Sequence, residues 1–373
     1  MMVENDVVTL CAVGDVGPDR EDPDSIFQFS AETTRGADIA FCQLERSLTK
    51  GGSRQVQIRS HHSRVDPKNV SALVSGGFNV VSFASNHTLD WGVEGLFDTM
   101  ELLKAKGMHV IGVGRDIEEA RRPVVIEKKG VKIAFLGYCS VLPKGYDAAP
   151  GVAGCAPLRA TTFYEQVDWQ AGTPPKIVTN TNQNDLNDMI KDIQKIRPLV
   201  DIVIVSVHWG IHFAPAMIAM YQREAGHAAI DAGADLILGH HAHILKGIEV
   251  YKGKTIFYSL GNFAFDVPAS FVLSDPGYRQ MRQRYPWDVD PGYTGYGYPV
   301  DSRKTMIVRC LISRKGIEKV SFLPALINKD AEPEILRVGD GRFKDVVDYL
   351  SSVSKIEKLE SRLTTSGDEV VVS

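Results

Sequence analysis

The chain has 373 residues, 44% of them hydrophobic and 24% charged, a composition that argues for a globular protein and against a disordered or fibrous one. Its formal net charge is −4 without long blocks of like charge, so nucleic acid is not an expected partner. Five widely spaced cysteines argue against a disulfide framework. No apolar run could span a bilayer and no secretory signal is evident, so we expect a cytoplasmic protein that acts without a membrane.

Short apolar runs rich in β-branched residues alternate with helical patterns along the chain. Most of these runs are apolar at nearly every position, as is typical of strands that are covered on both faces. The predicted strands are Val7–Val13, Ile39–Leu44, Val80–Ala84, Val131–Tyr138, Ile202–Val207, Leu236–Leu238 and Thr255–Leu260.

Helical periodicity is clearest from Val93 to Leu103, where Gly107 follows as a stop signal. Residues 184–198 and 216–232 give weaker helical patterns. Three Gly-containing turns between apolar runs predict β-hairpins, at residues 128–130, 252–254 and 314–316. The mixture predicts an α/β protein with central sheets and some antiparallel pairing.

Two segments, residues 140–182 and residues 267–303, break this pattern and are rich in Gly and Pro. Long irregular segments inside a compact domain are usually functional or mobile. The aromatic content of residues 267–303 suits a lid over a pocket, and a surface excursion is an equal alternative. We therefore expect one domain over residues 1–330 that includes this insertion, followed by a C-terminal extension over residues 331–373, with a helix and a polar tail.

Polar side chains follow most of the predicted strands at the point where each strand ends. Ligands of α/β sheets bind beyond the carboxyl ends of the strands, so these side chains are expected to converge. Each of these residues alone is weak evidence for a site, because a Gly-Asp pair is usually a turn and a lone histidine is more often a packed side chain than a ligand. Their convergence favours a metal site over a purely structural role. The residues are Asp15, Glu45, Asn86, His208, His241 and His243, with Asn262 after the last strand.

The side chains in this set have a shared chemical logic. Carboxylates can bridge two divalent cations, while imidazoles and an amide oxygen complete the coordination shells. Oxygen and nitrogen ligands without thiolates suit Mn, Fe or Zn. His241 and His243 could point the same way from an extended backbone. One or two such ions would activate a water for hydrolysis.

His87 follows Asn86 directly and precedes Asp90 by three residues. This spacing suggests that Asn86 holds a metal while His87 donates a proton to a leaving group, with Asp90 orienting the imidazole. Alternatively, Asp90 is only the N-cap of the following helix, and it could do both.

At these residues the chain resembles the CapA/PgsA-type poly-γ-glutamate capsule synthesis proteins, which carry a PGA_cap domain and are similar in turn to the calcineurin-like metallophosphatases. The matching motifs lie between about Val8 and Phe265. They are Gly14-Asp15 with Arg20, Leu44-Glu45, Arg59, Ser85-Asn86-His87-Thr88-Leu89-Asp90-Trp91-Gly92, His208-Trp209-Gly210, Gly233 to His243, and Gly247 to Phe263.

The resemblance implies a metallophosphatase-like layered α/β/β/α sandwich with a single site. It implies that Asp15, Glu45 and His243 hold one ion, and that Glu45 bridges to a second. The second ion would be held by Glu45, Asn86, His208 and His241, with His87 as the proton donor.

The sequence departs from these families at several positions. Gly17 stands where the metallophosphatases typically have a histidine, so one ion rather than two is possible, and His212 stands where the family commonly has a glutamate. His61 and His62 replace a Pro-containing stretch. The candidate substrate-binding residues are Arg20, Arg59, His61, His212 and Asn262.

Two classes of function fit these patterns. The first is a metal-dependent hydrolase that acts on a small soluble substrate, either a phosphoester or a lactone or amide carbonyl. The second is a non-catalytic accessory protein of poly-γ-glutamate capsule synthesis or export, although a polyanion would favour a basic groove. An inactive relative kept for protein interactions is a third reading. The sequence carries no signal for an oligomeric state.

Overall fold

The computed structural model describes residues 7–56 and 63–373. Arg59 and His61, which we predicted to bind substrate, and His62 lie outside the described residues. Among the residues described, no helix combines the length and the apolar character needed to cross a bilayer.

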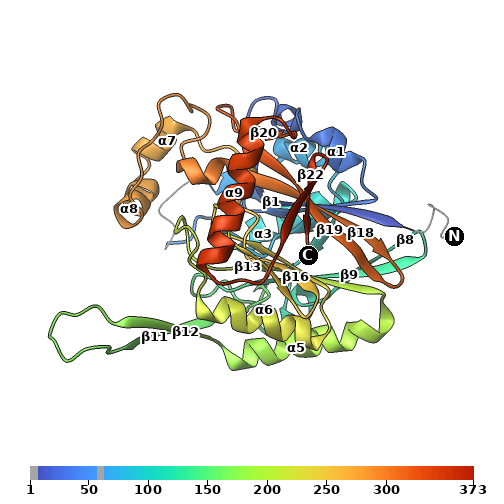
Figure 1. Cartoon of the computed structure of the whole chain (residues 1–373), viewed down its shortest axis with the longest axis horizontal. Coiled ribbons are helices and arrows are strands. Elements are labelled where there is room, and N and C mark those ends of the chain that lie inside the picture. Colours follow the sequence, from blue (N-terminus) through green and yellow to red (C-terminus); the bar gives the residue numbers. More distant parts are fainter. Residues whose placement is uncertain (1–6, 57–62) are drawn as a thin grey trace.

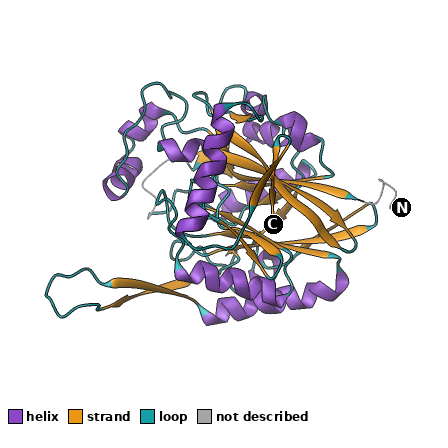
Figure 2. Cartoon of the chain, viewed as in Figure 1, coloured by secondary structure: helices purple, strands orange, loops and turns teal. Residues whose placement is uncertain are grey.

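Two large β-sheets form the centre of the molecule (Figures 1 and 2). The first has the order β21-β22-β19-β18-β1-β2-β5-β6, with β17 paired to β1 and β20 to β19. Its strands are β1 (Val8–Gly17), β2 (Ile39–Leu44), β5 (Val80–Ser82), β6 (His109–Ile111), β17 (Asn262–Phe265), β18 (Lys304–Ser313), β19 (Gly316–Ile327), β20 (Pro333–Ile335), β21 (Leu363–Ser366) and β22 (Glu369–Val372).

The second sheet has the order β15-β16-β14-β13-β9-β8. Its four central strands are parallel, and a hairpin closes each edge. The strands are β8 (Val124–Lys128), β9 (Val131–Cys139), β13 (Ile202–His208), β14 (Leu236–His240), β15 (Ile248–Tyr251) and β16 (Lys254–Phe257).

The sheets pack face to face because both present apolar side chains to one shared core. Leu10 and Phe41 of the first sheet and Phe135 and Ile204 of the second are fully or almost fully buried in this core. Stacking of Phe41 on Phe135, with ring centroids 6.2 Å apart, joins the layers directly. Burial on both faces is why these strands read as continuous apolar runs in the sequence.

Helices cover the outer face of each sheet. The first sheet is covered by α2 and α3, whose Leu73, Leu96 and Met100 share its outer core. The second is covered by α5 and α6, which pack on it through residues such as Met189 and Ala225. The helices are α1 (Ala31–Arg35), α2 (Val70–Ser75), α3 (Gly92–Ala105), α4 (Ile117–Ala120), α5 (Gln183–Ile196), α6 (Met220–Ala232), α7 (Ala269–Ser274), α8 (Pro276–Arg284) and α9 (Gly341–Ile356). The layered α/β/β/α class is confirmed.

Short elements complete the described part of the chain. Turns of 3₁₀-helix span Pro23–Phe27, Pro67–Asn69, Arg197–Leu199 and Val300–Arg303. Small two-stranded sheets pair β3 (Ser47–Leu48) with β4 (Arg64–Val65), β7 (Val113–Gly114) with β10 (Gly154–Cys155), and β11 (Ala160–Glu165) with β12 (Lys176–Thr181).

The predicted irregular segments contain more regular structure than expected. Residues 160–181 include the β11–β12 hairpin, and residues 267–303 include α7 and α8. In the second segment Tyr278, Tyr296 and Tyr298 form a small aromatic core of their own. Their burial explains the concentration of aromatic residues; the motion of a lid stays a prediction.

The polar tail predicted at the C-terminus is wrong. After α9, residues 363–372 form the β21–β22 hairpin, and β22 pairs with β19 of the large sheet. Val370 and Val372 are buried in the core between the sheets. The hairpin signal was the Ser366-Gly367-Asp368 turn between two strand-forming runs, where Gly367 has a positive φ of 60°.

We expect Val370→Asp to lower the free energy of unfolding by roughly 3 kcal/mol or more, because it buries an unpaired carboxylate. Denaturant unfolding monitored by circular dichroism measures this. The matched control is Thr364→Asp, at an exposed position of β21 on the face opposite to Val370, which should unfold like the wild type. Equal unfolding of the two variants would show that the hairpin is not part of the core.

Candidate metal centre

The site lies where the carboxyl ends of strands from both sheets meet. The first sheet supplies Asp15 at the end of β1, Glu45 directly after β2, and Asn86 in the loop after β5. The second supplies His208 as the last residue of β13, and two histidines after β14. Parallel pairing of β1 with β2, of β2 with β5, and of β13 with β14 puts these ends on one side of each sheet.

Two overlapping groups of ligand atoms form within this space. Glu45, His208 and His241 make one group, and Asp15, Glu45 and His243 make the other. Within each group the atoms lie within 4.8 Å of one another, and all of these side chains are buried. The structure thus brings together the residues that the sequence nominated, in the two groups that the resemblance implies, with Glu45 shared.

Asn86 completes the first group. Its Oδ1 lies 2.7 Å from His208 Nε2 and 3.2 Å from His241 Nδ1, while those two nitrogens are 3.1 Å apart. Burial lowers the pKa of His208 to about 4 and, together with the neighbouring histidines, holds that of His241 well below its usual value. Neutral imidazoles with an amide oxygen at this spacing are suited to share one cation.

Glu45 provides the clearest test of whether an ion fits. Both of its carboxylate oxygens are buried and neither has a hydrogen-bond partner among the described residues. Burial, opposed by nearby His243, raises its pKa to about 7. A buried carboxylate without hydrogen bonds is costly, and a divalent cation between the two donor groups would offset that cost. The residues present therefore fit one or two ions.

Asp15 is held by backbone contacts on both sides. Its N–H donates to Gly261 O at 2.9 Å, and its Oδ2 accepts from the N–H of His241 at 3.1 Å. A side chain at Gly14 would meet the same Gly261 O at 2.0 Å, so only glycine allows this close approach. Despite burial, the hydrogen bond and charge of His240 keep the pKa of Asp15 below its usual value.

His241 and His243 do not extend from β14 as we predicted. Both have positive φ, 86° and 55°, so the chain turns through the left-handed region instead of continuing as a strand. Histidine tolerates this region better than most residues, and such conformations concentrate at functional sites. The turn, rather than strand alternation, aims both rings at Glu45.

His240 is a member of the site that our sequence reasoning missed. It is fully buried, and its Nδ1 lies 3.3 Å from Asp15 Oδ1. It is the last residue of β14, and its ring lies against Phe41 in the core between the sheets. The alternation of the strand was the available signal, because His240 faces the neighbouring sheet.

Asn262 contacts a candidate ligand, and its predicted role in substrate binding stays a prediction. Its Oδ1 lies 2.8 Å from His243 Nδ1, and its Nδ2 donates to Tyr296 Oη at 2.7 Å. Tyr296 in turn donates to Ser302 O at 2.9 Å, which fixes the direction of the whole chain of hydrogen bonds. His243 Nδ1 therefore carries the proton, and its Nε2 faces Glu45 at 3.7 Å.

His87 and Asp90 form the expected pair. His87 Nδ1 lies 2.6 Å from Asp90 Oδ2, and the side chain of His87 is 33% exposed whereas that of Asp90 is fully buried. Burial alone would lower the pKa of His87, but the charge and hydrogen bond of Asp90 raise it to about 9. Tyr146 Oη donates to the other oxygen of Asp90 at 3.0 Å. The N-cap alternative is wrong, because the N-cap position of α3 is Trp91 and no side chain caps the helix there.

His212 lies in the site beside the candidate ligands. Its ring centroid is 4.0 Å from that of His241 and 5.2 Å from that of His243, and burial holds its pKa well below the usual value. The ring of Tyr298, from the 267–303 segment, lies tilted against that of His243, with the centroids 5.1 Å apart. The aromatic segment thus borders the centre.

The basic residues near the site have other partners. Arg20 binds Asp266 with two nitrogens, at 2.6 and 3.1 Å, and also donates to Asp330 O. Lys246 is buried, where burial lowers its pKa to about 8, and it donates to Ala214 O and Met217 O. Both side chains fix loops around the site, so a role for Arg20 in substrate binding stays a prediction.

Gly17 marks the departure from the metallophosphatase motif. A side chain at this position would meet the Phe265 ring at 2.8 Å and Arg46 Cδ at 3.1 Å. Arg46 is itself buried, with its guanidinium 4.6 Å from the centroid of the Phe265 ring. The space for a histidine at position 17 is therefore filled by these two side chains.

Removing a candidate ligand should empty the centre without unfolding the protein. We expect His241→Ala and Asn86→Ala each to abolish bound metal, because each removes a donor from the group around His208. Elemental analysis of the purified variants measures the metal, and circular dichroism checks the fold. Unchanged metal content in both variants would contradict the ligand assignment.

Asn262→Ala should weaken metal binding without abolishing it, by about 10–100-fold in affinity, since the hydrogen bond that orients His243 is lost. Competition with a fluorescent chelator measures the affinity. Asn328→Ala is the control, because Asn328 makes comparable amide hydrogen bonds with Glu332 and Glu334 in a surface turn. Equal affinity in both variants would mean that Asn262 does not support the ligand.

Two solved structures show distant similarity to this chain. A hypothetical protein from Thermus thermophilus aligns over 85% of this chain and 98% of its own, at 12% identity and a TM-score of 0.47. A structure described as PhoD aligns over 89% of this chain and 68% of its own, at 7% identity and a TM-score of 0.37. Neither carries an inference about activity.

Comparison with curated sequences is more specific. The chain is 31% identical over 271 residues to the PGA biosynthesis protein CapA of Bacillus subtilis, covering 70% of this chain and 64% of that protein. It is 27% identical to the capsule biosynthesis protein CapA of Bacillus anthracis, with 70% and 61% covered. The match therefore spans less than two thirds of either relative. Residues 6–267 match the family described as bacterial capsule synthesis protein PGA_cap, so the chain belongs to this family.

Proposed function

We propose that the protein is a metal-dependent hydrolase of a small soluble substrate, either a phosphoester or a carbonyl compound such as a lactone or amide. The observation that carries the proposal is Glu45, which belongs to both groups of buried donors and whose two oxygens have no hydrogen-bond partner among the described residues. Such a donor set suits Mn, Fe or Zn. Bound there, a divalent ion would supply Lewis acidity and make water more acidic.

Other side chains of the protein would transfer the proton and position the substrate. Asp90 holds the imidazole of His87 at 2.6 Å, and the partly exposed His87 is placed to give a proton to a leaving group. The rings of His212 and Tyr298 lie against the candidate ligand His243. In this place they would position a substrate and exclude water.

The choice between phosphoester and carbonyl substrates depends on which positively charged side chains are available to bind a substrate. Within the described residues, Arg20 and Lys246 have carboxylate or carbonyl partners. A phosphate would therefore rely on the metal and on protonated His87 for charge compensation, whereas a carbonyl bond needs no further cation. Because Arg20 and Lys246 already have partners, we keep carbonyl compounds among the proposed substrates.

The second candidate is an accessory role in making or exporting a polyanion. It is favoured by the relatives, among them a Mycobacterium tuberculosis protein described as a probable polyglutamine synthesis accessory protein, 29% identical over 245 residues. That match covers 61% of this chain and 56% of the relative. In this role the metal centre would be structural.

The deciding experiment combines elemental analysis with a screen of phosphoester, lactone and amide substrates. We expect hydrolysis that stops on chelation and returns with the native metal, and that is lost in Glu45→Gln. Binding of poly-γ-glutamate that is unaffected by chelation, without turnover of any substrate class, would contradict the hydrolase proposal and support the accessory role.

His87→Ala should retain bound metal but lose about 10²–10⁴-fold in kcat, because the proton donor is removed while the donor groups stay intact. Steady-state kinetics with the best substrate from the screen, beside elemental analysis, measures both. His109→Ala, at an exposed position of β6, is the control and should keep full activity. Loss of metal in His87→Ala would make His87 a ligand instead.

A further inference from the structure

Tyr146 connects a segment of the second sheet to the pair formed by His87 and Asp90. It lies in the residues that follow β9, and its exposed fraction is 2%. Its Oη donates to Asp90 Oδ1 at 3.0 Å, although the two residues are 56 positions apart in sequence. Asp90 Oδ2 lies 2.6 Å from His87 Nδ1, so the buried carboxylate is hydrogen-bonded through both of its oxygens. The tyrosine hydroxyl is thus one end of a chain whose other end is the proposed proton donor.

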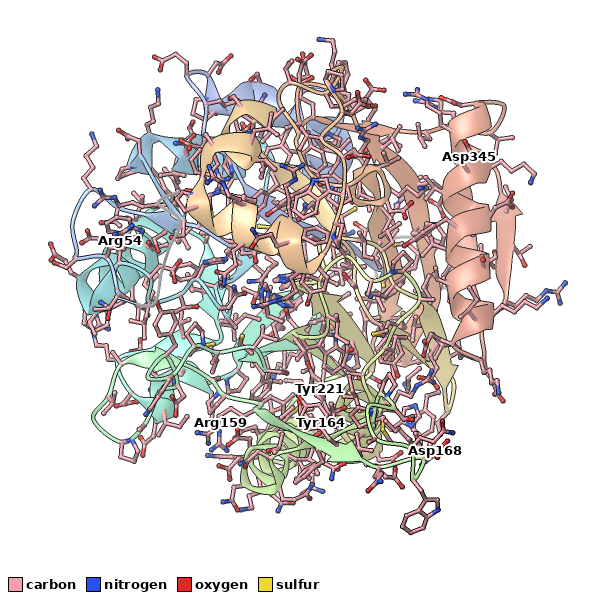
Figure 3. All side chains as sticks on the ribbon, turned by 90° about the vertical axis from the view of Figure 1, so that its left-hand side faces the viewer. Arg54, Arg159, Tyr164, Asp168, Tyr221 and Asp345 are labelled. Carbon is pink, nitrogen blue, oxygen red and sulfur yellow. The ribbon has the colours of Figure 1, made fainter. Side chains whose placement is uncertain are left out.

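The backbone around Tyr146 holds its ring in this direction. Tyr146 O accepts from Cys155 N at 2.9 Å. A side chain at Gly154 would meet Tyr146 O at 2.6 Å, so the two stretches of chain approach as closely as glycine allows. The segment ends at Arg159, labelled in Figure 3, whose guanidinium binds Asp147, the neighbour of Tyr146, at 3.0 Å and a carboxylate of α5 at 2.7 Å. The direction of the hydroxyl is therefore set by the fold.

The hydrogen bond from Tyr146 restricts the carboxylate of Asp90. A carboxylate that is bonded through one oxygen can turn about its terminal torsion, because the wells of that torsion are broad. A bond to the second oxygen fixes the plane of the carboxylate, and this plane determines the angle at which His87 Nδ1 can donate to it. The side chain of His87 is 33% exposed, so it is open to solvent on one side and depends on Asp90 for its orientation.

A purely structural role for Tyr146 makes a different prediction. Its ring belongs to the outer core of the first sheet, where a phenylalanine ring would fill the same space. The two roles therefore differ in what the hydroxyl does. Under a structural role, loss of the hydroxyl would change the free energy of unfolding and leave the proton transfer by His87 unchanged.

We propose that Tyr146 is a positioning residue for His87, acting through Asp90. The inference rests on the proposed hydrolase function, because it concerns the proton that His87 gives to the leaving group. In this step the proton passes from His87 to the leaving oxygen or nitrogen as the bond from that atom to phosphorus or carbon breaks. Tyr146 keeps its own proton throughout, and its part is to keep the donor at the angle that the transfer needs.

The first test varies the leaving group, because a proton donor matters most when the leaving group is a poor one. The substrates are phosphate or carboxylate esters, according to the class that the substrate screen identifies. Tyr146→Phe should lower kcat about 10-fold for the ester of a simple alkyl alcohol, since the donor is less well placed. For the p-nitrophenyl ester kcat should stay close to that of the wild type, and KM should change little for either ester.

A double-mutant cycle separates positioning from stability. Tyr146→Phe in a protein that already carries His87→Ala should cause no further loss of kcat, because the donor that it positions is gone. Tyr138→Phe is the matched control. The Tyr138 hydroxyl also donates from a buried ring to a carboxylate, Asp192 Oδ2 at 2.9 Å, but on the face of the second sheet that α5 covers. This variant should keep the wild-type kcat with both esters.

A second readout does not depend on turnover. In the zinc-loaded protein with isotope-labelled histidine, the Nδ1–H of His87 should give a far-downfield proton resonance, because it donates to a buried carboxylate at short distance. The absence of this resonance from His87→Ala assigns it. Tyr146→Phe should move the resonance and speed the exchange of its proton with water, and Tyr138→Phe should leave it in place.

Three results would overturn the proposal. They are an equal loss of kcat for both esters in Tyr146→Phe, a full further loss when this change is added to His87→Ala, and a His87 resonance that Tyr146→Phe leaves unchanged. If no substrate is turned over, the hydrolase proposal fails, while a moved resonance would still support the positioning of His87 by Tyr146. Circular dichroism should show the wild-type fold, because phenylalanine keeps the ring in the core.

Discussion

The structure depends on two carboxylates, Asp15 and Glu45, that are buried at the junction of two sheets. The carboxylate of Asp15 is stabilised by the backbone N–H of His241 and by the ring of His240, whereas the side chain of Glu45 has no hydrogen bond from any described residue. A charge in this position destabilises a protein unless another charge compensates it. Burial favours the neutral imidazoles of His208 and His241, so these two rings supply lone pairs rather than positive charge.

This constraint explains the architecture around the centre. Gly14 lets β1 approach Gly261 closely, which brings Asp15 and Asn262 to the same end of the sheet. The left-handed turn after β14 directs two rings inward from the other sheet. Lys246 ties down the loop that follows His212 by binding its carbonyl groups. Each of these features carries a local cost that makes sense only if it maintains the geometry of the centre.

Much of this could be predicted from the sequence. The strand ends nominated the candidate ligands because continuous apolar runs mark buried parallel strands, and their carboxyl ends share one edge. The pairing of His87 with Asp90 followed from their three-residue spacing. The contacts of Asn262 lacked a local signal, because His243 and Tyr296 are distant in sequence. For His240 and the C-terminal hairpin a signal existed, in the alternation of the strand and in the Ser366-Gly367-Asp368 turn, but the neighbouring histidines and the polar composition of the tail masked it.

The division of donors between the sheets has a mechanical consequence. Asp15, Glu45 and Asn86 come from one sheet, while His208, His241 and His243 come from the other. An ion bound among them would act as a cross-link between the two halves of the sandwich, and its binding energy would add to the cohesion of the fold. The availability of metal would then determine how easily the two sheets separate, as well as which chemistry the site can perform.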